Sequence, residues 1–306
     1  MAGQRKAEPT WAREVKSSAH LFLATSDGLG AEGATRLGDW LVQNVPSAEL
    51  PQVSDVAVSL KFEATGPQAF AVHLAAAEAF EGGDVAVVPQ KDLHRSLLIC
   101  DMDSTIITTE SLDELAGYVG ISNEVAAITT RAMNGEIGFR DALAQRVSLL
   151  NGLSVGAIAE CVSQIEYSPG ARALIAGARA SGLRTVLVSG GFSPFAEHVA
   201  TELGFDRWVA NNLEIKAGRL TGRVLDPVVT AETKVAVMRE ECASLGITPR
   251  SVCAIGDGAN DVAMLAEAGL GIAYRAKPLV RKMVTYQIQE SSLATALIWL
   301  GIDQAE

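Results

Sequence analysis

The chain has 306 residues, 48% of them hydrophobic, which is enough to bury a substantial core. Its net charge of -11 would repel a phosphate backbone, which excludes nucleic acid as an expected partner. The charged N-terminus has no apolar leader, and the most apolar late segment, residues 293–302, is far shorter than the ~20 residues that cross a bilayer. The four cysteines and four histidines show no metal-ligand spacing, so neither zinc nor disulfides are expected. We therefore expect a soluble, cytoplasmic protein with no membrane partner.

Residues 1–92 are predicted to form a small α/β domain. Three strand patterns are separated by two helical ones, in the order 20–26 (strand), 33–45 (helix), 55–64 (strand), 67–80 (helix) and 84–88 (strand). Ferredoxin-like amino-acid-sensing domains are similar but have four strands, and no ligand signature accompanies the three found in this segment. Regulatory, dimerising and purely structural roles all remain open for this domain.

From residue 93 to 306 the pattern is that of a parallel sheet covered on both faces. Short apolar runs recur at residues 96–101, 184–190, 251–257 and 270–274. Residues 207–224 alternate with period two around KAGR, which predicts a hairpin. The fold class is therefore α/β, with a doubly wound, Rossmann-like core.

Residues 106–167, between the first two apolar runs, are helical in pattern throughout. Four helical segments are bounded by Gly, Ser or Asn, at residues 110–120, 122–135, 138–152 and 154–165. An insertion of this size predicts a helical cap domain within the core.

Polar residues follow the apolar runs at the points where the predicted strands end. Asp101 ends the first run, Ser189 and Gly190 end the second, and Asp257 ends the third. Because parallel strands bring their carboxyl ends to one rim, where ligands bind in such sheets, we expect these residues to lie together.

Asp101 and Asp103 fit a pair in which one carboxylate is a nucleophile and its neighbour a general acid and base. Carboxylates at one rim repel each other unless a cation lies among them, and oxygen ligands beside a phosphate suit Mg²⁺. The expected metal ligands are Asp101, Asp103 and Asp257.

Ser189 and Gly190 would offer a hydroxyl and a backbone N–H to an anion at a strand-to-helix turn. Lys234 falls in the first turn of a predicted helix, where the dipole disfavours a cation by up to about 1 kcal/mol. Taken singly, each of these motifs is more often a cap or a turn than a site. Their joint occurrence at strand ends of one domain favours a phosphate site.

The motifs together resemble those of the haloacid dehalogenase superfamily of phosphatases. DMDST at 101–105 is similar to its nucleophile motif, Ser189 to its second motif, Lys234 to its third, and GDGAND at 256–261 to its fourth. Within the superfamily, DMDST, SGGF at 189–192 and ESLDELA at 110–116 resemble the phosphoserine phosphatase family.

This resemblance implies Mg²⁺-dependent hydrolysis of L-phosphoserine through an aspartyl-phosphate, the last step of serine biosynthesis. It implies that Glu110 binds the substrate ammonium, that Arg146 binds its carboxylate, and that Met133 and Phe139 close over it. Phe139 and Arg146 are seven residues apart in one helical segment, so they share a face. Asn260 is expected to orient the phosphate site and Asp261 to support the metal ligands.

Two other readings remain open. The same chemistry could act on another small phosphorylated metabolite such as phosphohomoserine, or transfer the phosphoryl group to a second alcohol. Glu110 and Arg146 are the sequence features that favour an α-amino acid. The chain could instead be a binding or regulatory protein with a silent site, and its oligomeric state, a homodimer included, is left open.

Overall fold

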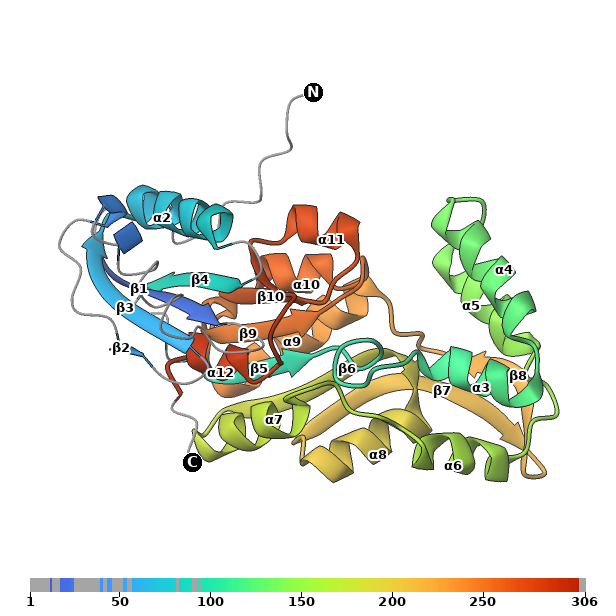
Figure 1. The fold of residues 1–306 in the computed structure, drawn as a ribbon. Helices are drawn as coiled ribbons and strands as arrows, with labels where there is room; N and C mark the ends of the chain where they lie inside the picture. The colour runs from blue at the N-terminus through green and yellow to red at the C-terminus, as the bar shows by residue number, and fades with distance from the viewer. Residues whose placement is uncertain are drawn as a thin grey trace.

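The computed structural model describes residues 12, 17–24, 39–40, 43–45, 52–53, 57–80, 83–89, 93 and 95–302. Figure 1 shows a small sheet domain (blue), a central sheet with helices on both sides, and a group of helices (green) at the opposite end. Among the described residues, no helix is both long and apolar enough to span a bilayer.

The central sheet has seven strands. In spatial order they are β11 (Tyr286–Ile288), β10 (Leu270–Tyr274), β9 (Val252–Gly256), β5 (Leu97–Cys100), β6 (Arg184–Phe192), β7 (Arg207–Lys216) and β8 (Arg219–Leu225). All neighbouring pairs are parallel except β7–β8, which is the predicted hairpin. The chain leaves β5 towards β6 on one side and later returns to β9 on the other, so the strand order reverses between β5 and β9. The doubly wound, Rossmann-like core is confirmed, and the three-residue β11 is the strand that the sequence did not reveal.

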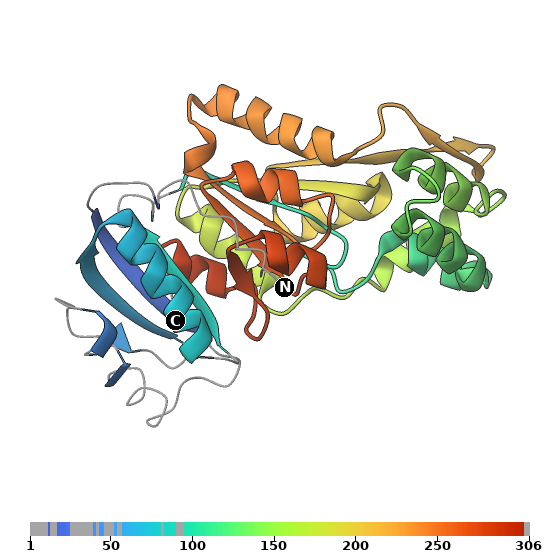
Figure 2. The same cartoon turned by 90° about the horizontal axis from the view of Figure 1, so that it is seen from above.

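Helices cover both faces of this sheet (Figure 2). One face carries α9 (Ala231–Leu245), α10 (Val262–Glu267) and α11 (Pro278–Met283), and the other α7 (Ala171–Ala180), α8 (Ser193–Leu203) and α12 (Thr295–Trp299). Alternate residues of β5 divide between the two apolar clusters: Leu97 and Ile99 belong to one, and Leu98 and Cys100 to the other. Double coverage is the reason that the strand is a continuous apolar run.

Four helices lie beyond the rim of the sheet and form the cap. They are α3 (Ser111–Val119), α4 (Ser122–Met133), α5 (Phe139–Ser148) and α6 (Val155–Ser163), and each falls within one predicted helical segment. The two linkers to the core pair with each other through a bridge between Ile107 and Tyr167. The exact domain boundaries stay a prediction.

The N-terminal domain has four antiparallel strands in the order β2-β3-β1-β4. They are β1 (Ser17–Ala24), β2 (Gln52–Val53), β3 (Ala57–Ala64) and β4 (Asp84–Pro89), with α2 (Gly66–Ala79) between β3 and β4. The prediction of three strands was therefore wrong by one, because a two-residue strand is too short to show a period. The order matches the ferredoxin-like arrangement. Most of the helix predicted at 33–45 lies outside the described residues, although 39, 40, 43 and 44 are helical.

This domain docks on the core through β4. The buried carboxylate of Asp84 accepts hydrogen bonds from the backbone N–H groups of Gln289 (2.7 Å) and Ser291 (2.8 Å). The hydroxyl of Tyr286, in β11, donates to the carbonyl of Val87 at 2.8 Å. A buried polar junction therefore ties the two sheets together.

Candidate active site

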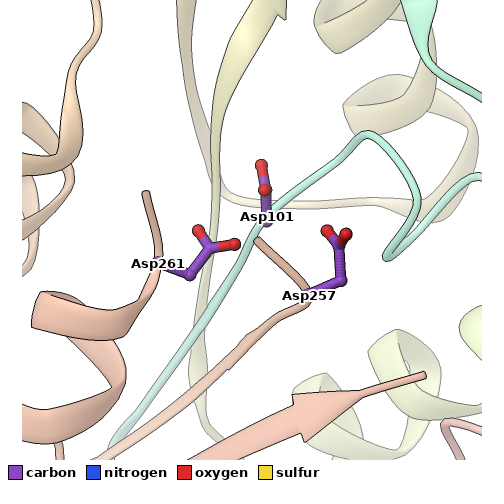
Figure 3. A group of neighbouring side chains, drawn as sticks. All are labelled: Asp101, Asp257 and Asp261. Carbon is purple, nitrogen blue, oxygen red and sulfur yellow. The ribbon is translucent and has the colours of Figure 1, made fainter. Parts of the chain in front are cut away.

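Three carboxylates meet where the strand order reverses (Figure 3). Asp101 directly follows β5, Asp257 directly follows β9, and Asp261 precedes α10. One carboxylate oxygen from each residue can be chosen so that all three oxygens lie within 4.8 Å of one another, and all three residues are buried. The predicted meeting of strand ends is therefore present, with Asp261 in the cluster itself.

Lys234 reaches this cluster from α9. A capping box between Thr230 and Thr233 fixes the start of the helix, and Lys234 follows directly. Its ammonium lies 2.8 Å from Oδ1 of Asp101 and 2.7 Å from Oδ1 of Asp261, and the residue is fully buried. Burial alone would lower the pKa of Lys234, but these two carboxylates outweigh it and raise the pKa above its usual range. The unfavourable helix position is thus offset by two short ion pairs.

The carboxylate cluster carries more negative charge than Lys234 can balance. Burial, followed by the charge of Asp261, raises the pKa of Asp101. Burial is also the main cause that raises the pKa of Asp257 to about 6. Both shifts express first the cost of burying an anion and then the repulsion from neighbouring carboxylates. Since all the donors are oxygens, the residues fit a hard divalent cation. This acidic triad could therefore bind a metal.

The carboxylate of Asp103 contacts the first helix of the cap. It accepts from the backbone N–H of Ser111 at 3.1 Å and from the Ser111 hydroxyl at 3.0 Å. Burial, and next the charge of Glu110, raise the pKa of Asp103 to about 7. A Cβ at Gly191 would lie 2.5 Å from the Asp103 carboxylate, so only glycine allows the two segments to approach this closely. Asp103 is thus a half-buried carboxyl that can hold a proton near neutral pH.

Ser189 and Gly190 lie within β6, which extends to Phe192. The predicted turn at this point was wrong, because the chain stays in the strand as far as Phe192. The pairing of β6 with β7 shifts register between Val188 and Phe192. Asn211, buried in β7, donates from Nδ2 to the carbonyl of Gly190 at 2.7 Å and holds this irregular strand end.

The loop after β9 is held by one contact from the segment after β5 and one within the loop itself. Thr105 donates from its hydroxyl to Oδ1 of Asp257 at 3.2 Å, and the N–H of Gly258 donates to Oδ2 of Asp261 at 2.9 Å. Asn260 is half-buried in the same loop. The segment GDGAND therefore presents Asp257 to the rim as a fixed carboxylate.

Glu110 is placed by contacts on two sides. It occupies the N-cap position of α3, and its carboxylate accepts from the hydroxyl of Ser104 at 2.9 Å. Ser104 has a φ of +55°, a conformation that is rare for a residue with a side chain. The ammonium of Lys277 lies 3.8 Å from Oε1 of Glu110 and 3.7 Å from Oδ2 of Asp257. Lys277 thus stands between the cap carboxylate and the triad.

Arg146 and Phe139 both lie on α5. Arg146 donates from Nε to the carbonyl of Ala142 at 3.3 Å, and burial lowers its pKa while the charges of Asp113 and Glu110 act in the opposite direction. Phe139 is 44% exposed at the start of the helix. Met133 ends α4, and its side chain lies outside the part of the chain that the structure describes.

Four residues that the sequence did not single out contact the site residues, namely Thr105, Ser111, Asn211 and Lys277. Thr105 and Ser111 fall within the quoted motifs and could have been recognised there. Asn211 and Lys277 come from distant segments, and no local pattern marks them.

Known proteins similar to this chain point to one family. A model of haloacid dehalogenase-like hydrolases matches residues 98–266. A probable phosphoserine phosphatase of Schizosaccharomyces pombe is 45% identical over 214 residues, covering 69% of this chain and 72% of that protein. The crystal structure of a had family hydrolase from Salmonella enterica serovar Typhi has a TM-score of 0.83 at 25% identity, covering 94% of this chain and 99% of that chain.

A further solved structure is a phospho-aspartyl intermediate analogue of phosphoserine phosphatase. It has a TM-score of 0.63 at 34% identity and covers 67% of this chain and 99% of that chain. The family model spans more than half of the 306 residues, and its match contains the three carboxylates and Lys234. The chain therefore belongs to the haloacid dehalogenase-like hydrolase family.

Proposed function

We propose that this protein hydrolyses L-phosphoserine to L-serine and phosphate, in a Mg²⁺-dependent reaction that passes through an aspartyl-phosphate on Asp101. The observation that carries the proposal is the arrangement around Asp101. A buried carboxylate at the sheet rim is paired with Lys234, and Asp103, whose pKa is about 7, lies two residues further on. The relatives described as phosphoserine phosphatases support the choice of substrate.

In the first step, a carboxylate oxygen of Asp101 attacks phosphorus and the bond from phosphorus to the serine oxygen breaks. Asp103, protonated at the start, gives its proton to the departing oxygen. In the second step Asp103 takes a proton from water, and the resulting hydroxide oxygen attacks the phosphorus of the aspartyl-phosphate. Phosphate leaves and the Asp101 carboxylate is restored.

The charge on the phosphoryl oxygens is stabilised by groups at the rim. Lys234 supplies a buried positive charge, and Ser189 and the N–H of Gly190 supply hydrogen-bond donors. Mg²⁺, held by the carboxylates of Asp101 and Asp257 and the carbonyl of Asp103, would supply further positive charge to these oxygens. Asp261 keeps Lys234 in place through the 2.7 Å ion pair and supports the metal site.

Residues of the cap recognise the amino-acid part of the substrate. Glu110 binds the ammonium group and Arg146 the carboxylate, which a guanidinium can hold through two parallel hydrogen bonds. Phe139 and Met133 exclude water over the bound substrate.

Phosphate release by the full chain tests the substrate and the metal together. Rates with L-phosphoserine, phosphothreonine, a sugar phosphate and p-nitrophenyl phosphate are compared with Mg²⁺ and with a chelator. A Mg²⁺-dependent preference for phosphoserine is expected. Equal rates on all four substrates would leave the chemistry in place and remove phosphoserine as the substrate.

The covalent step is tested by acid quenching during turnover of ³²P-labelled phosphoserine. Label should remain on the wild-type protein and be absent from Asp101→Asn. Label on that variant would remove Asp101 as the nucleophile.

A further inference from the structure

The β7–β8 hairpin is bonded to the cap through its backbone. The N–H of Gly152 donates to the carbonyl of Leu220, and the N–H of Leu220 donates to the carbonyl of Leu153, both at 2.8 Å. A third hydrogen bond runs from the N–H of Val155 to the carbonyl of Gly218 at 3.0 Å. The loop between α5 and α6 therefore pairs with β8 much as a further strand would.

Side chains extend this contact along α5. Arg219 donates from Nη1 to the carbonyl of Gly152 at 2.7 Å, and its backbone is bridged to Ser154. Arg140, in the first turn of α5, forms an exposed ion pair with Asp226 at 3.2 Å, which contributes little energy by itself. Contacts from β8 and from Asp226, the residue after it, thus reach the loop that follows α5 and the first turn of α5, and Figures 1 and 2 both show the hairpin beside the cap.

Gly222 is a point of close approach between β8 and the cap. A Cβ there would lie 3.0 Å from the carbonyl oxygen of Ser148 and 3.1 Å from the Cβ of Asn151. Gly218, in the turn of the same hairpin, has a similar φ of +72° against +77° for Gly222, but a Cβ there would meet no atom of the described residues within 4 Å. The two glycines share one backbone requirement, and only at Gly222 would an added Cβ meet the cap, since Gly218 contacts it through its carbonyl alone.

The hairpin also reaches the phosphate-binding strand end. Its strand β7 pairs with β6, and Asn211 in β7 holds the carbonyl of Gly190 at 2.7 Å, next to Ser189. Arg146 lies on α5, two residues before Ser148. Hydrogen bonds therefore join the loop after α5 to β8, β8 to β7, and β7 to the end of β6 that carries Ser189.

We propose that this hairpin is a specificity-determining element, because it sets the distance between Arg146 and the phosphate-binding end of β6. It thereby favours substrates whose carboxylate and phosphate are separated as in phosphoserine. The inference rests on the proposed function, since it requires a substrate with both groups. Gly222 is a positioning residue that acts through Arg146.

The experiment compares Gly222→Ala with Gly218→Ala in the full chain, using L-phosphoserine and p-nitrophenyl phosphate, which has no carboxylate. Gly222→Ala should raise KM for phosphoserine about tenfold, because small displacements of a binding group are costly, while kcat/KM for the aryl phosphate changes less than about twofold. Gly218→Ala, with the same backbone strain, should change both by less than about twofold. Equal losses on the two substrates would overturn the proposal.

A double-mutant cycle tests the route through Arg146. In the Arg146→Ala background, Gly222→Ala should have no further effect on phosphoserine, and full additivity would overturn the proposal. If Gly222→Ala does not fold, Arg219→Ala removes one tie without adding volume and should raise KM for phosphoserine about threefold, again without affecting the aryl phosphate. An equal effect of Arg219→Ala on both substrates would overturn the proposal in that case.

The wild-type protein separates this inference from the proposed function. A wild type that prefers phosphoserine, combined with equal losses in the variants, removes the role of the hairpin alone. A wild type without that preference removes the proposed substrate, and the inference falls with it.

Discussion

The proposed phosphate end of the site and its proposed amino-acid end are built in different ways. The phosphate end consists of Asp101, Ser189, Lys234, Asp257 and Asp261, which follow strands of the core or pack against them and are all buried. At the amino-acid end, the side chain of Glu110 is 44% exposed, and Phe139 and Arg146 lie on a cap helix.

Burial makes charge interactions strong at the phosphate end. At the amino-acid end solvent reaches Glu110 and weakens its charge interactions. With the proposed roles, the reaction depends on a buried rim of the core, whereas substrate choice depends on more exposed residues of the cap. Substitutions at the rim should therefore affect every substrate alike, and substitutions in the cap should not.

The largest effect is expected for Asp101→Asn. Because the amide cannot replace the attacking carboxylate, turnover of phosphoserine and of p-nitrophenyl phosphate should fall equally, by about four orders of magnitude or more. Asp226→Asn is the matched control, since its side chain is 85% exposed and outside the site. Steady-state rates on both substrates and a thermal melt decide the outcome, and a loss confined to phosphoserine would contradict the division between the two ends.

Lys234→Met should reduce both rates by about 10³-fold and also destabilise the protein. The substitution leaves the carboxylates of Asp101 and Asp261 buried without their partner, which costs about 3–5 kcal/mol. Denaturant unfolding measures this loss, and added Mg²⁺ should recover part of it because a cation near Asp101 replaces the missing charge. Unchanged stability would show that the ion pairs contribute nothing to the fold.

Arg146→Ala should separate the two ends most clearly. The carboxylate of phosphoserine loses its cationic partner, so kcat/KM for phosphoserine should fall about 10²-fold, which corresponds to about 2.7 kcal/mol. The rate with p-nitrophenyl phosphate should stay within about twofold. Arg140→Ala, on the same helix, is the control and should leave both substrates unaffected.

Glu110→Gln should shift a pH profile. The charge of Glu110 raises the pKa of Asp103, which is about 7, and Asp103 must be protonated to assist the leaving group. Removing that charge lowers the pKa, so the alkaline limb of kcat/KM for an aryl phosphate should move to lower pH. A limb that stays in place, or moves to higher pH, would show that Asp103 does not set it.

The smallest effect is expected for Lys277→Met. Its ammonium lies 3.7 Å from Asp257, but the side chain is 59% exposed, so solvent screens the interaction. Loss of this cation should tighten Mg²⁺ binding by about twofold to fivefold, measured by calorimetry, with Lys277→Arg close to wild type. Weaker binding would indicate that Lys277 positions Asp257 and does not compete with the metal.

The phosphate end could be predicted from the sequence because its residues follow continuous apolar strands. A strand covered on both faces must be apolar throughout, so the polar residue that ends it stands out, as Asp101 and Asp257 do. The residues that orient the site could not be predicted in this way. Asn211 reaches Gly190 across 21 positions of sequence, and such a contact exists only once the sheet has formed.

Short strands and irregular strand ends also escape a reading of the sequence. β2 and β11 have two and three residues, fewer than a repeat needs, and β6 continues through Gly190 and Gly191 although glycine usually marks a turn. The cap helices were predictable as helices. The contact between the cap and the β7–β8 hairpin was not, because it consists of three backbone hydrogen bonds, which almost any sequence could form.

The junction at Asp84 has a consequence for shortened versions of the chain. A fragment that begins at residue 93 keeps every residue proposed for the reaction, yet it loses the carboxylate that receives the N–H groups of Gln289 and Ser291. It also uncovers the edge strand β11 and the aromatic ring of Tyr286, which is 3% exposed in the whole chain. Exposed strand edges with apolar neighbours recruit other chains. We therefore expect such a fragment to aggregate more readily than the whole chain.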